Sequence, residues 1–195
     1  MDYLKEAMPE QVNSLGRLSA PIGKLSLEEL EPRAQALMSL IQRETDPARL
    51  VPLHFLLARI RLRQDRTQEA YLALQEAAAL DERKDPMLWG FYLITMNFIE
   101  GFSATIAAGQ RLLEQKGASP LLFWPLASIA IDQREIERAN DFISRLLQTE
   151  CHPELCALLL RSFAAKFFCI GADQDAERML VQSRELDGGR GSEQA

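Results

Sequence analysis

Cysteine and histidine side chains are the first candidates for chemistry in this sequence. The stretch CHPELC, residues 151–156, places His152 between two thiols, and Cys169 is the third cysteine. Structural zinc sites need four ligands, usually as closely spaced Cys or His pairs, and the distant third thiol does not complete that pattern. We therefore expect no metal and no other cofactor. Because an odd number of cysteines is not a disulfide framework, we expect all three to be reduced.

Catalytic signatures are absent from the sequence. It contains two histidines, and it has no nucleophile elbow, no HExxH zinc motif and no phosphate-binding loop. His54 lies on the apolar side of an expected helix, where a packed structural role is the simpler interpretation. The carboxylates of LEELEPR and QDAER lie in first turns of helices, where they complement the helix dipole. We therefore predict that the protein is not an enzyme and has no catalytic residues.

Composition and charge bound the fold and the partners. At 195 residues, with 47% hydrophobic and 26% charged residues, the chain suits one folded domain or one array of repeats. A formal net charge of -6 gives no attraction to a nucleic-acid backbone or an anionic membrane, so we predict neither as a partner. The longest apolar runs, such as Pro120 to Ile131, are too short to span a bilayer. The first residues lack the basic and apolar blocks of a signal peptide, so we expect a cytoplasmic protein.

The spacing of apolar residues predicts an all-helical protein. They recur at steps of three and four along almost the whole chain, and no stretch alternates as a half-buried strand does. Ser26 and Glu29 form a capping-box motif before a helix from about Leu27 to Glu44. Further breaks delimit eight helices of about 12 to 17 residues. These breaks fall near Asp65-Arg66, Asp85-Pro86, Gly101, 117–120, Gln133-Arg134, 151–153, Gly171 and Gly188-Gly189.

The segments between these breaks repeat with a period of about 34 residues. Three of them align in register: PLHFLLARIRLRQDRTQEAYLALQEAAALDE, SPLLFWPLASIAIDQREIERANDFISRLLQTE and ELCALLLRSFAAKFFCIGADQDAERMLVQSRELDG. Each first helix carries a small residue after Leu or Phe, namely Ala58, Ala127 and Ala164. Each second helix carries an alanine followed four residues later by a large aliphatic residue, namely Ala70 with Leu74, Ala139 with Ile143, and Ala176 with Leu180. Helix pairs of this kind bury their apolar faces only by stacking on neighbours.

This pattern resembles the tetratricopeptide repeat, a helix-turn-helix unit of about 34 residues with a small residue in each helix. The resemblance covers about residues 51 to 187. The stretch Met87 to Gly117 fits less well, because Trp89 lies one residue away from the family's aromatic position, and no unit ends in the family's proline. The resemblance implies an all-α fold: an antiparallel helix-pair solenoid, or tetratricopeptide-like superhelix, of about four repeats plus an N-terminal helix.

The expected domain organisation has three parts. Residues 1–25 form an N-terminal arm, in which prolines and glycines interrupt apolar residues spaced by three and four. Residues 26–187 form the repeat domain, with repeats at about 51–84, 86–118, 119–152 and 153–187. Residues 188–195 form a polar, glycine-rich tail that we expect to be disordered. No capping helix follows the last repeat, so we expect the face of Met179 and Leu180 to be exposed and available for a homodimer.

The resemblance also implies a binding surface. In tetratricopeptide proteins the first helices of successive pairs line an inner groove, where a partner binds as an extended peptide or a helix. Transferred by register, that geometry gives Phe55, Arg59 and Leu62, then Phe91, Thr95 and Phe98, then Trp124, Ser128 and Ile131, then Arg161, Ala165 and Phe168. Five of these side chains are aromatic, and a large exposed apolar patch is seldom tolerated without a partner. The alternative is that the N-terminal arm fills this groove and makes these residues core.

The predicted function is a non-catalytic protein-protein interaction module: an adaptor, scaffold or chaperone that binds a peptide or helix of a partner protein. One alternative is a structural subunit of a larger assembly, such as a bacterial secretion or surface apparatus, with contacts through its end faces and its arm. A second is a regulatory subunit in which Arg59, Arg63 and Arg161 hold an acidic segment. The plainer interpretation of Arg59 and Arg63 is a solvated helix edge.

Overall fold

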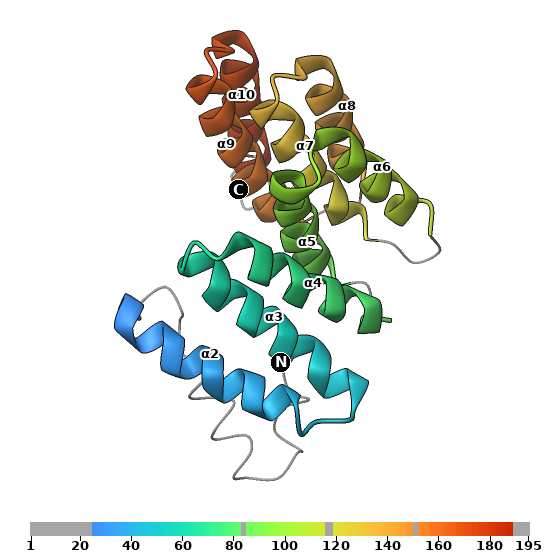
Figure 1. Ribbon diagram of the computed structural model, residues 1–195. Coiled ribbons are helices and arrows are strands. Elements are labelled where there is room, and N and C mark those ends of the chain that lie inside the picture. The colour runs from blue at the N-terminus through green and yellow to red at the C-terminus, as the bar shows by residue number, and fades with distance from the viewer. Residues whose placement is uncertain (1–24, 83–84, 116–118, 150–151, 189–195) are drawn as a thin grey trace, which may run out of the picture. The chain divides into compact units, whose positions relative to one another are not determined.

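The computed structural model describes residues 25–82, 85–115, 119–149 and 152–188. Almost all of the predicted N-terminal arm and the predicted tail lie outside these residues, as does Cys151. Every regular element among the described residues is helical, which confirms the predicted all-α fold class (Figure 1). The chain divides into two units, Met1–Arg83 (unit 1) and Lys84–Ala195 (unit 2).

Unit 1 contains three described helices that lie side by side in Figure 1: α2 (Leu27–Ile41), α3 (Pro47–Arg63) and α4 (Thr67–Leu80). The predicted helix over 27–44 begins where expected, because Glu29 accepts hydrogen bonds from the backbone N–H (2.8 Å) and the hydroxyl (3.0 Å) of Ser26. These bonds lower the pKa of Glu29. The helix ends at Ile41, earlier than predicted, because the next residues form a turn on the carbonyl oxygen of Leu40.

Unit 2 contains three helix pairs (Figure 1): α5 (Pro86–Ile99) with α6 (Phe102–Leu113), α7 (Phe123–Asp132) with α8 (Ile136–Leu147), and α9 (Pro153–Cys169) with α10 (Asp173–Gly188). A short 3-10 helix, η3 (Pro120–Leu122), leads into α7. Proline opens α5, η3 and α9, where its missing N–H would have no helical partner. Asp85 caps α5 by accepting hydrogen bonds from the N–H groups of Met87 (2.8 Å) and Leu88 (3.4 Å).

The same kind of turn joins the two helices of each pair. One residue in each turn adopts the left-handed conformation: Asp65 (φ 57°), Gly101 (φ 86°), Arg134 (φ 61°) and Gly171 (φ 79°). Glycine adopts this conformation without strain, whereas Asp65 and Arg134 carry a Cβ that makes it unfavourable in isolation. All four residues lie at predicted helix breaks, so a repeated turn geometry underlies the period found in the sequence.

Small residues lie where the two helices of a pair approach each other. In three pairs the alanines of both helices are at most 1% exposed: Ala58 with Ala70, Ala127 with Ala139, and Ala164 with Ala176. Leu74 and Ile143, four residues after the second alanine, are at most 2% exposed. Larger side chains at the alanine positions would force the helix axes apart. These three pairs therefore have the close approach that the sequence predicts.

The pair α5–α6 departs from this pattern, as its sequence does. Ile106 takes the place of the alanine in the second helix. The small residues of this pair face the following first helix instead. A Cβ on Gly90 would lie 3.1 Å from Trp124 Cζ3, and a Cβ on Gly109 would lie 2.4 Å from Leu126 Cδ2. Glycine at these two positions therefore allows α7 to lie directly against α5 and α6.

The end face of α10 differs from the prediction. Met179 is 3% exposed within the core of unit 2, and Leu180 packs against that core, so the expected exposed face is wrong for Met179. Val181, at 52% exposure, is the large apolar residue that α10 presents to solvent. One residue along a helix turns the side chain by about 100°, so a small error in register moves a residue from the surface to the core.

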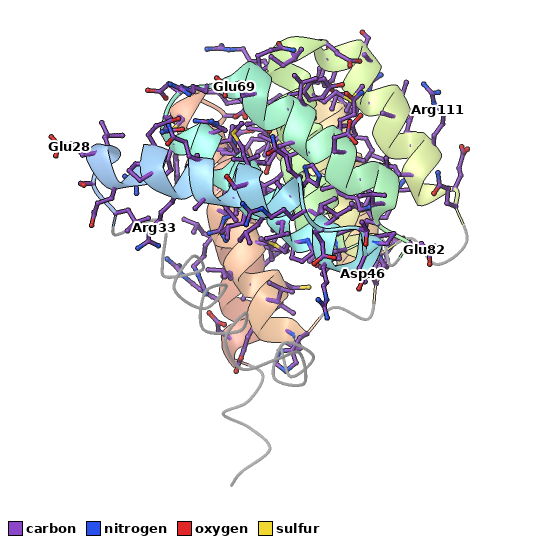
Figure 2. All side chains as sticks on the ribbon, turned by 60° about the horizontal axis from the view of Figure 1, so that its bottom comes forward. Glu28, Arg33, Asp46, Glu69, Glu82 and Arg111 are labelled. Carbon is purple, nitrogen blue, oxygen red and sulfur yellow. The ribbon has the colours of Figure 1, made fainter. Side chains whose placement is uncertain are left out.

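Arg61 is a buried cation that joins the three described helices of unit 1. Charged side chains such as Glu28, Glu82 and Arg111 point outward (Figure 2), whereas the Arg61 side chain is 5% exposed. Its guanidinium contacts Glu31 on α2 (2.7 Å) and Glu69 on α4 (3.0 Å). Hydrogen bonds from Arg61 and from Gln64 lower the pKa of Glu31. The network adds charged contacts to the apolar packing of α2, which consists of Leu30, Ala34 and Leu37.

The substitution Arg61→Ala should lower the free energy of unfolding by about 2 kcal/mol. Breaking a fully buried pair costs about 3–5 kcal/mol, but Glu31 and Glu69 are 36% and 51% exposed and can regain water. The pKa of Glu31 is lowered in the fold, so the ionised carboxylate stabilises the folded state. This stabilisation is fully present above the ordinary pKa of 4.5 and is lost as the pH falls through the lowered value. Chemical denaturation followed by circular dichroism measures both effects.

The matched control for this substitution is Arg49→Ala. Arg49 also contacts two carboxylates, Glu44 (3.7 Å) and Asp46 (3.6 Å), but its side chain is 47% exposed. Exposed ion pairs contribute about 0–1 kcal/mol, so this variant should stay within about 1 kcal/mol of the wild type. Equal destabilisation by the two substitutions would contradict a special role for Arg61.

The substitution Gly109→Val should destabilise unit 2 by about 2 kcal/mol or more, because Leu126 is fully buried and has little room to move. Gln110→Val on the exposed side of the same helix is the control, and it should change the free energy of unfolding by about 0.5 kcal/mol or less. Thermal and urea unfolding of both variants provides the measurement. A stable Gly109→Val variant would mean that α6 and α7 are not in close contact.

Candidate partner-binding surface

The residues of the predicted groove divide between the two units. Phe55, Arg59 and Leu62 belong to α3 in unit 1. Phe55 and Leu62 are partly buried, and the exposed Arg59 guanidinium lies 5.9 Å from the centre of the Phe55 ring. That distance is compatible with a cation–π contact. The remaining predicted residues belong to α5, α7 and α9 in unit 2.

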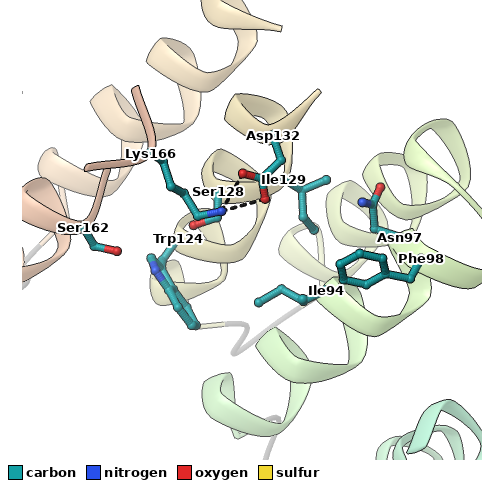
Figure 3. A pocket seen from close by; sticks show the side chains of 9 residues that line it. All are labelled: Ile94, Asn97, Phe98, Trp124, Ser128, Ile129, Asp132, Ser162 and Lys166. Carbon is teal, nitrogen blue, oxygen red and sulfur yellow. Dashed lines mark hydrogen bonds and ion pairs between the residues drawn. The ribbon is translucent and has the colours of Figure 1, made fainter. Parts of the chain in front are cut away.

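Unit 2 contains a hollow of about 260 Å³ between α5, α7 and α9 (Figure 3). Three predicted residues line it: Phe98, Trp124 and Ser128. Six lining residues were not predicted: Ile94, Asn97, Ile129, Asp132, Ser162 and Lys166. We call this feature, defined by these nine residues, the hollow.

One side of the hollow is apolar. Phe98 is 75% exposed, which makes it the most exposed large apolar side chain among the described residues. Ile94, one turn earlier on α5, and Trp124 on α7 are partly buried and face the same space (Figure 3). The Trp124 ring lies against Gly90, where a Cβ would come within 3.1 Å of it. The glycine therefore allows the indole to lie close to α5.

The hollow also has polar lining residues, which come from all three helices. Lys166 on α9 donates to both carboxylate oxygens of Asp132 on α7, at 2.6 Å each (Figure 3). Ser128 is 4% exposed, whereas Ser162 is exposed. The Oδ1 atom of Asn97 is buried and has no hydrogen-bond partner among the described residues. An unsatisfied buried acceptor is uncommon and needs an explanation.

The lining residues share the repeat period. Asp132 and Lys166 are 34 residues apart. The same spacing relates Phe98 to Asp132, and it relates Ile94, Ser128 and Ser162 to one another. On each first helix, the lining side chains follow one another at steps of four, as Trp124, Ser128 and Asp132 do. The hollow is thus built from equivalent positions of three successive repeats.

Six predicted residues of unit 2 lie elsewhere, among them the exposed Ala165 on α9. Thr95 is buried, and its hydroxyl donates to the carbonyl oxygen of Phe91 (2.7 Å), which is partly buried. Ile131 is fully buried in the core. Arg161 is held by Asp187 (2.6 Å) and Ser183 (3.1 Å) across α9 and α10, and Phe168 is 46% exposed outside the hollow.

The register used for α9 explains the displacement of Arg161, Ala165 and Phe168. It counts back from the turn that ends each first helix, and α9, with 17 residues, is longer than α7, with 10. The residues that line the hollow instead lie at a nearly constant number of residues after the proline that opens each first segment, namely Pro86, Pro120 and Pro153. One signal in the sequence could have identified the polar lining residues. Asp132 and Lys166 carry opposite charges and are one repeat period apart.

The histidine and cysteine side chains lie outside the hollow. Burial lowers the pKa of His54, and nearby Glu76 opposes this shift, so the imidazole is neutral at pH 7. Cys169 is a free, exposed thiol, whereas Cys156 is disulfide-bonded. The expectation of three reduced thiols is therefore wrong for Cys156, because an odd cysteine count excludes a complete framework but not a single bond. Within the described ranges, no group of three potential ligands is placed to hold a metal ion.

The comparisons with known proteins bear on the fold. The sequence matches no protein-family model and no curated protein. The crystal structure of MamA is similar, with a TM-score of 0.56 and 14% identity over 84% of this chain and 92% of that chain. The crystal structure of BtubC (BKLC) from P. vanneervenii has a TM-score of 0.57 and 14% identity over 87% of this chain and 76% of that chain.

At this level of identity the likeness concerns the fold alone. It agrees with the all-helical architecture described above. A membrane span needs about 20 apolar residues in a helix. Within the part of the chain that is described, no helix combines that length and apolarity. The chain is thus similar in fold to two known helical structures.

Proposed function

We propose that the protein is a non-catalytic interaction module, an adaptor, scaffold or chaperone, that binds a segment of a partner protein at the hollow of unit 2. The observation that carries the proposal is Phe98, an aromatic side chain that is 75% exposed at the edge of a concave, largely apolar site. Exposed aromatic groups beside a pocket are typical of residues that dominate binding energy at protein interfaces. We further propose a cytoplasmic location.

The size of the hollow favours a polypeptide segment over a cofactor. Small-molecule sites have volumes of about 300–1,000 Å³ and enclose most of the ligand. The hollow has about 260 Å³ and is open to one side, so it suits one large side chain of a longer ligand. The repeated positions on α5, α7 and α9 form a row, and a row suits an extended segment or a helix that continues beyond the hollow.

A structural subunit is the second candidate, and one observation favours it. The last helix pair exposes Leu155 (36%), Leu158 (56%) and Val181 (52%), although each is a large apolar side chain. Such residues could form a permanent contact with a neighbouring subunit. The regulatory alternative has less support, because Arg161 is already paired with Asp187.

The substitution Phe98→Glu should abolish partner binding and leave the fold intact. The side chain is mostly exposed, so the free energy of unfolding should change by about 0.5 kcal/mol or less. The full-length tagged protein is used to capture partners from native lysate, and mass spectrometry quantifies each captured protein. We expect the amount of the specific partner to fall at least tenfold, since a buried carboxylate would oppose docking.

The matched variant is Val181→Glu, which places the same charge on an exposed apolar residue of α10. The proposed function requires that this variant captures the partner as the wild type does. Loss of partners with Val181→Glu and their retention with Phe98→Glu would instead identify the last helix pair as the contact surface and support the subunit alternative. Circular dichroism of both variants checks that they are folded.

A further inference from the structure

The charge pattern at the hollow specifies which segment it would bind. We infer that the hollow takes one large apolar side chain from an extended partner segment that carries basic residues beside it. This inference rests on the proposed function, because it names the chemistry of the partner at the same site. Its three parts are an apolar anchor, recognition of the partner's main chain, and a contact with Asp132.

The apolar anchor is set by Ile94, Phe98 and Trp124. These three side chains face the same space, and about 260 Å³ accommodates one aromatic or large aliphatic side chain. Aromatic rings prefer edge-to-face or offset contact with other rings, and both Phe98 and Trp124 offer a ring. A phenylalanine, tyrosine, tryptophan or leucine side chain would cover Phe98 and remove its exposed area from water.

The main chain of an extended segment can form hydrogen bonds to polar side chains that line the hollow. Asn97 lines it as well, but its Oδ1 atom is buried, so we assign that atom no direct contact with the partner. The exposed Ser162 hydroxyl can both donate and accept. An extended strand leaves its N–H and C=O groups available for such bonds, whereas a regular helix bonds these groups internally.

The ion pair between Asp132 and Lys166 decides the preferred charge. Lys166 uses two of its three N–H donors on Asp132, whereas the carboxylate has about four acceptor positions and uses two. Asp132 is also the more accessible partner, with 52% of its side chain exposed against 35% for Lys166. A lysine or arginine of the partner can therefore add to Asp132 without breaking the existing pair.

The field of the whole chain acts in the same direction. The formal net charge of -6 attracts a basic segment and repels an acidic one before contact. An acidic segment would have to compete with Asp132 for Lys166, and it would approach against this field. The structure thus favours a basic segment over an acidic one, and the acidic segment becomes the outcome that would overturn the inference.

Short synthetic peptides test the inference on the full chain. Three peptides have a central phenylalanine between lysines, glutamines or glutamates, and a fourth replaces the phenylalanine of the lysine peptide by alanine. The protein contains two tryptophans, so Trp89→Phe leaves Trp124 in the hollow as the only indole reporter. Fluorescence titration at low and at physiological ionic strength gives a Kd for each peptide.

The expected order of affinity is lysine, then glutamine, then glutamate. The lysine peptide should bind about fivefold or more tightly than the glutamate peptide at low ionic strength, which is the scale of a solvent-exposed ion pair. The alanine peptide should not change Trp124 fluorescence. Equal or tighter binding of the glutamate peptide would overturn the preferred charge, and equal binding of the alanine peptide would overturn the apolar anchor.

Two variants separate a local contact from the general attraction between a basic peptide and an acidic protein. Asp132→Asn should remove most of the preference for lysine over glutamate. Asp141→Asn makes the same change at an exposed aspartate, also paired with a cation, on the outer side of α8, and it should keep the preference. Equal loss in both variants would show that net charge alone acts. If circular dichroism shows that Asp132→Asn is unfolded, the order of peptide affinities for the Trp89→Phe protein still shows which charge of the partner segment is preferred.

Failure of this inference is distinguishable from failure of the proposed function. If none of the peptides binds while Phe98→Glu still abolishes capture of the natural partner, the hollow is a binding site and its occupant has another chemistry. If the peptides do not bind and Phe98→Glu has no effect on capture, both proposals fail together.

Discussion

The close approach of two helices at buried alanines is the constraint on which the structure depends. In three of the four pairs, alanines of both helices are at most 1% exposed, so neither helix has a side chain that keeps the axes apart. One left-handed residue, such as Asp65 or Arg134, then returns the chain over a short distance. The same helix packing and the same turn geometry recur in successive pairs. The first helices α5, α7 and α9 therefore carry equivalent residues at an almost constant separation in the sequence.

The hollow exists because one pair breaks this rule. In α5–α6 the small residues are Gly90 and Gly109, and they face α7 instead of each other. Gly109 admits Leu126 and so fixes α7 against α6, while Gly90 leaves room for the Trp124 ring beside α5. The Trp124 indole on α7 is thereby held against α5, whereas Phe98, near the end of α5, is 75% exposed. A local departure from the repeat thus creates the concave apolar surface.

Much of the fold could be predicted from the sequence, because the helix breaks and the buried alanines are local signals. Helix capping by Ser26 and Glu29 is an example, since the motif and the hydrogen bonds involve residues three apart. Three of the residues predicted for a groove line the hollow, and whether they bind a partner stays a prediction. Phe98, Trp124 and Ser128 followed from register, but Lys166 did not, since its place depends on the length of α9 as well as on the period. The exposure of a side chain is harder to predict than the helix that carries it, because an error of one residue in register moves the side chain to another face of the helix. Met179 is an example, since it was expected at the surface and is buried.

Helix packing does not determine the residue type at the equivalent positions that line the hollow on α5, α7 and α9. The alanine positions hold the same residue type in three pairs, because the helix separation permits nothing larger. The position occupied by Phe98, Asp132 and Lys166 holds an aromatic ring, an anion and a cation in successive repeats, so the fold does not dictate it. Asp132 and Lys166 neutralise each other, whereas Phe98 is 75% exposed among the described residues. This position is therefore free to serve the proposed partner segment, which would contact the exposed ring of Phe98 and the Asp132–Lys166 ion pair one repeat away.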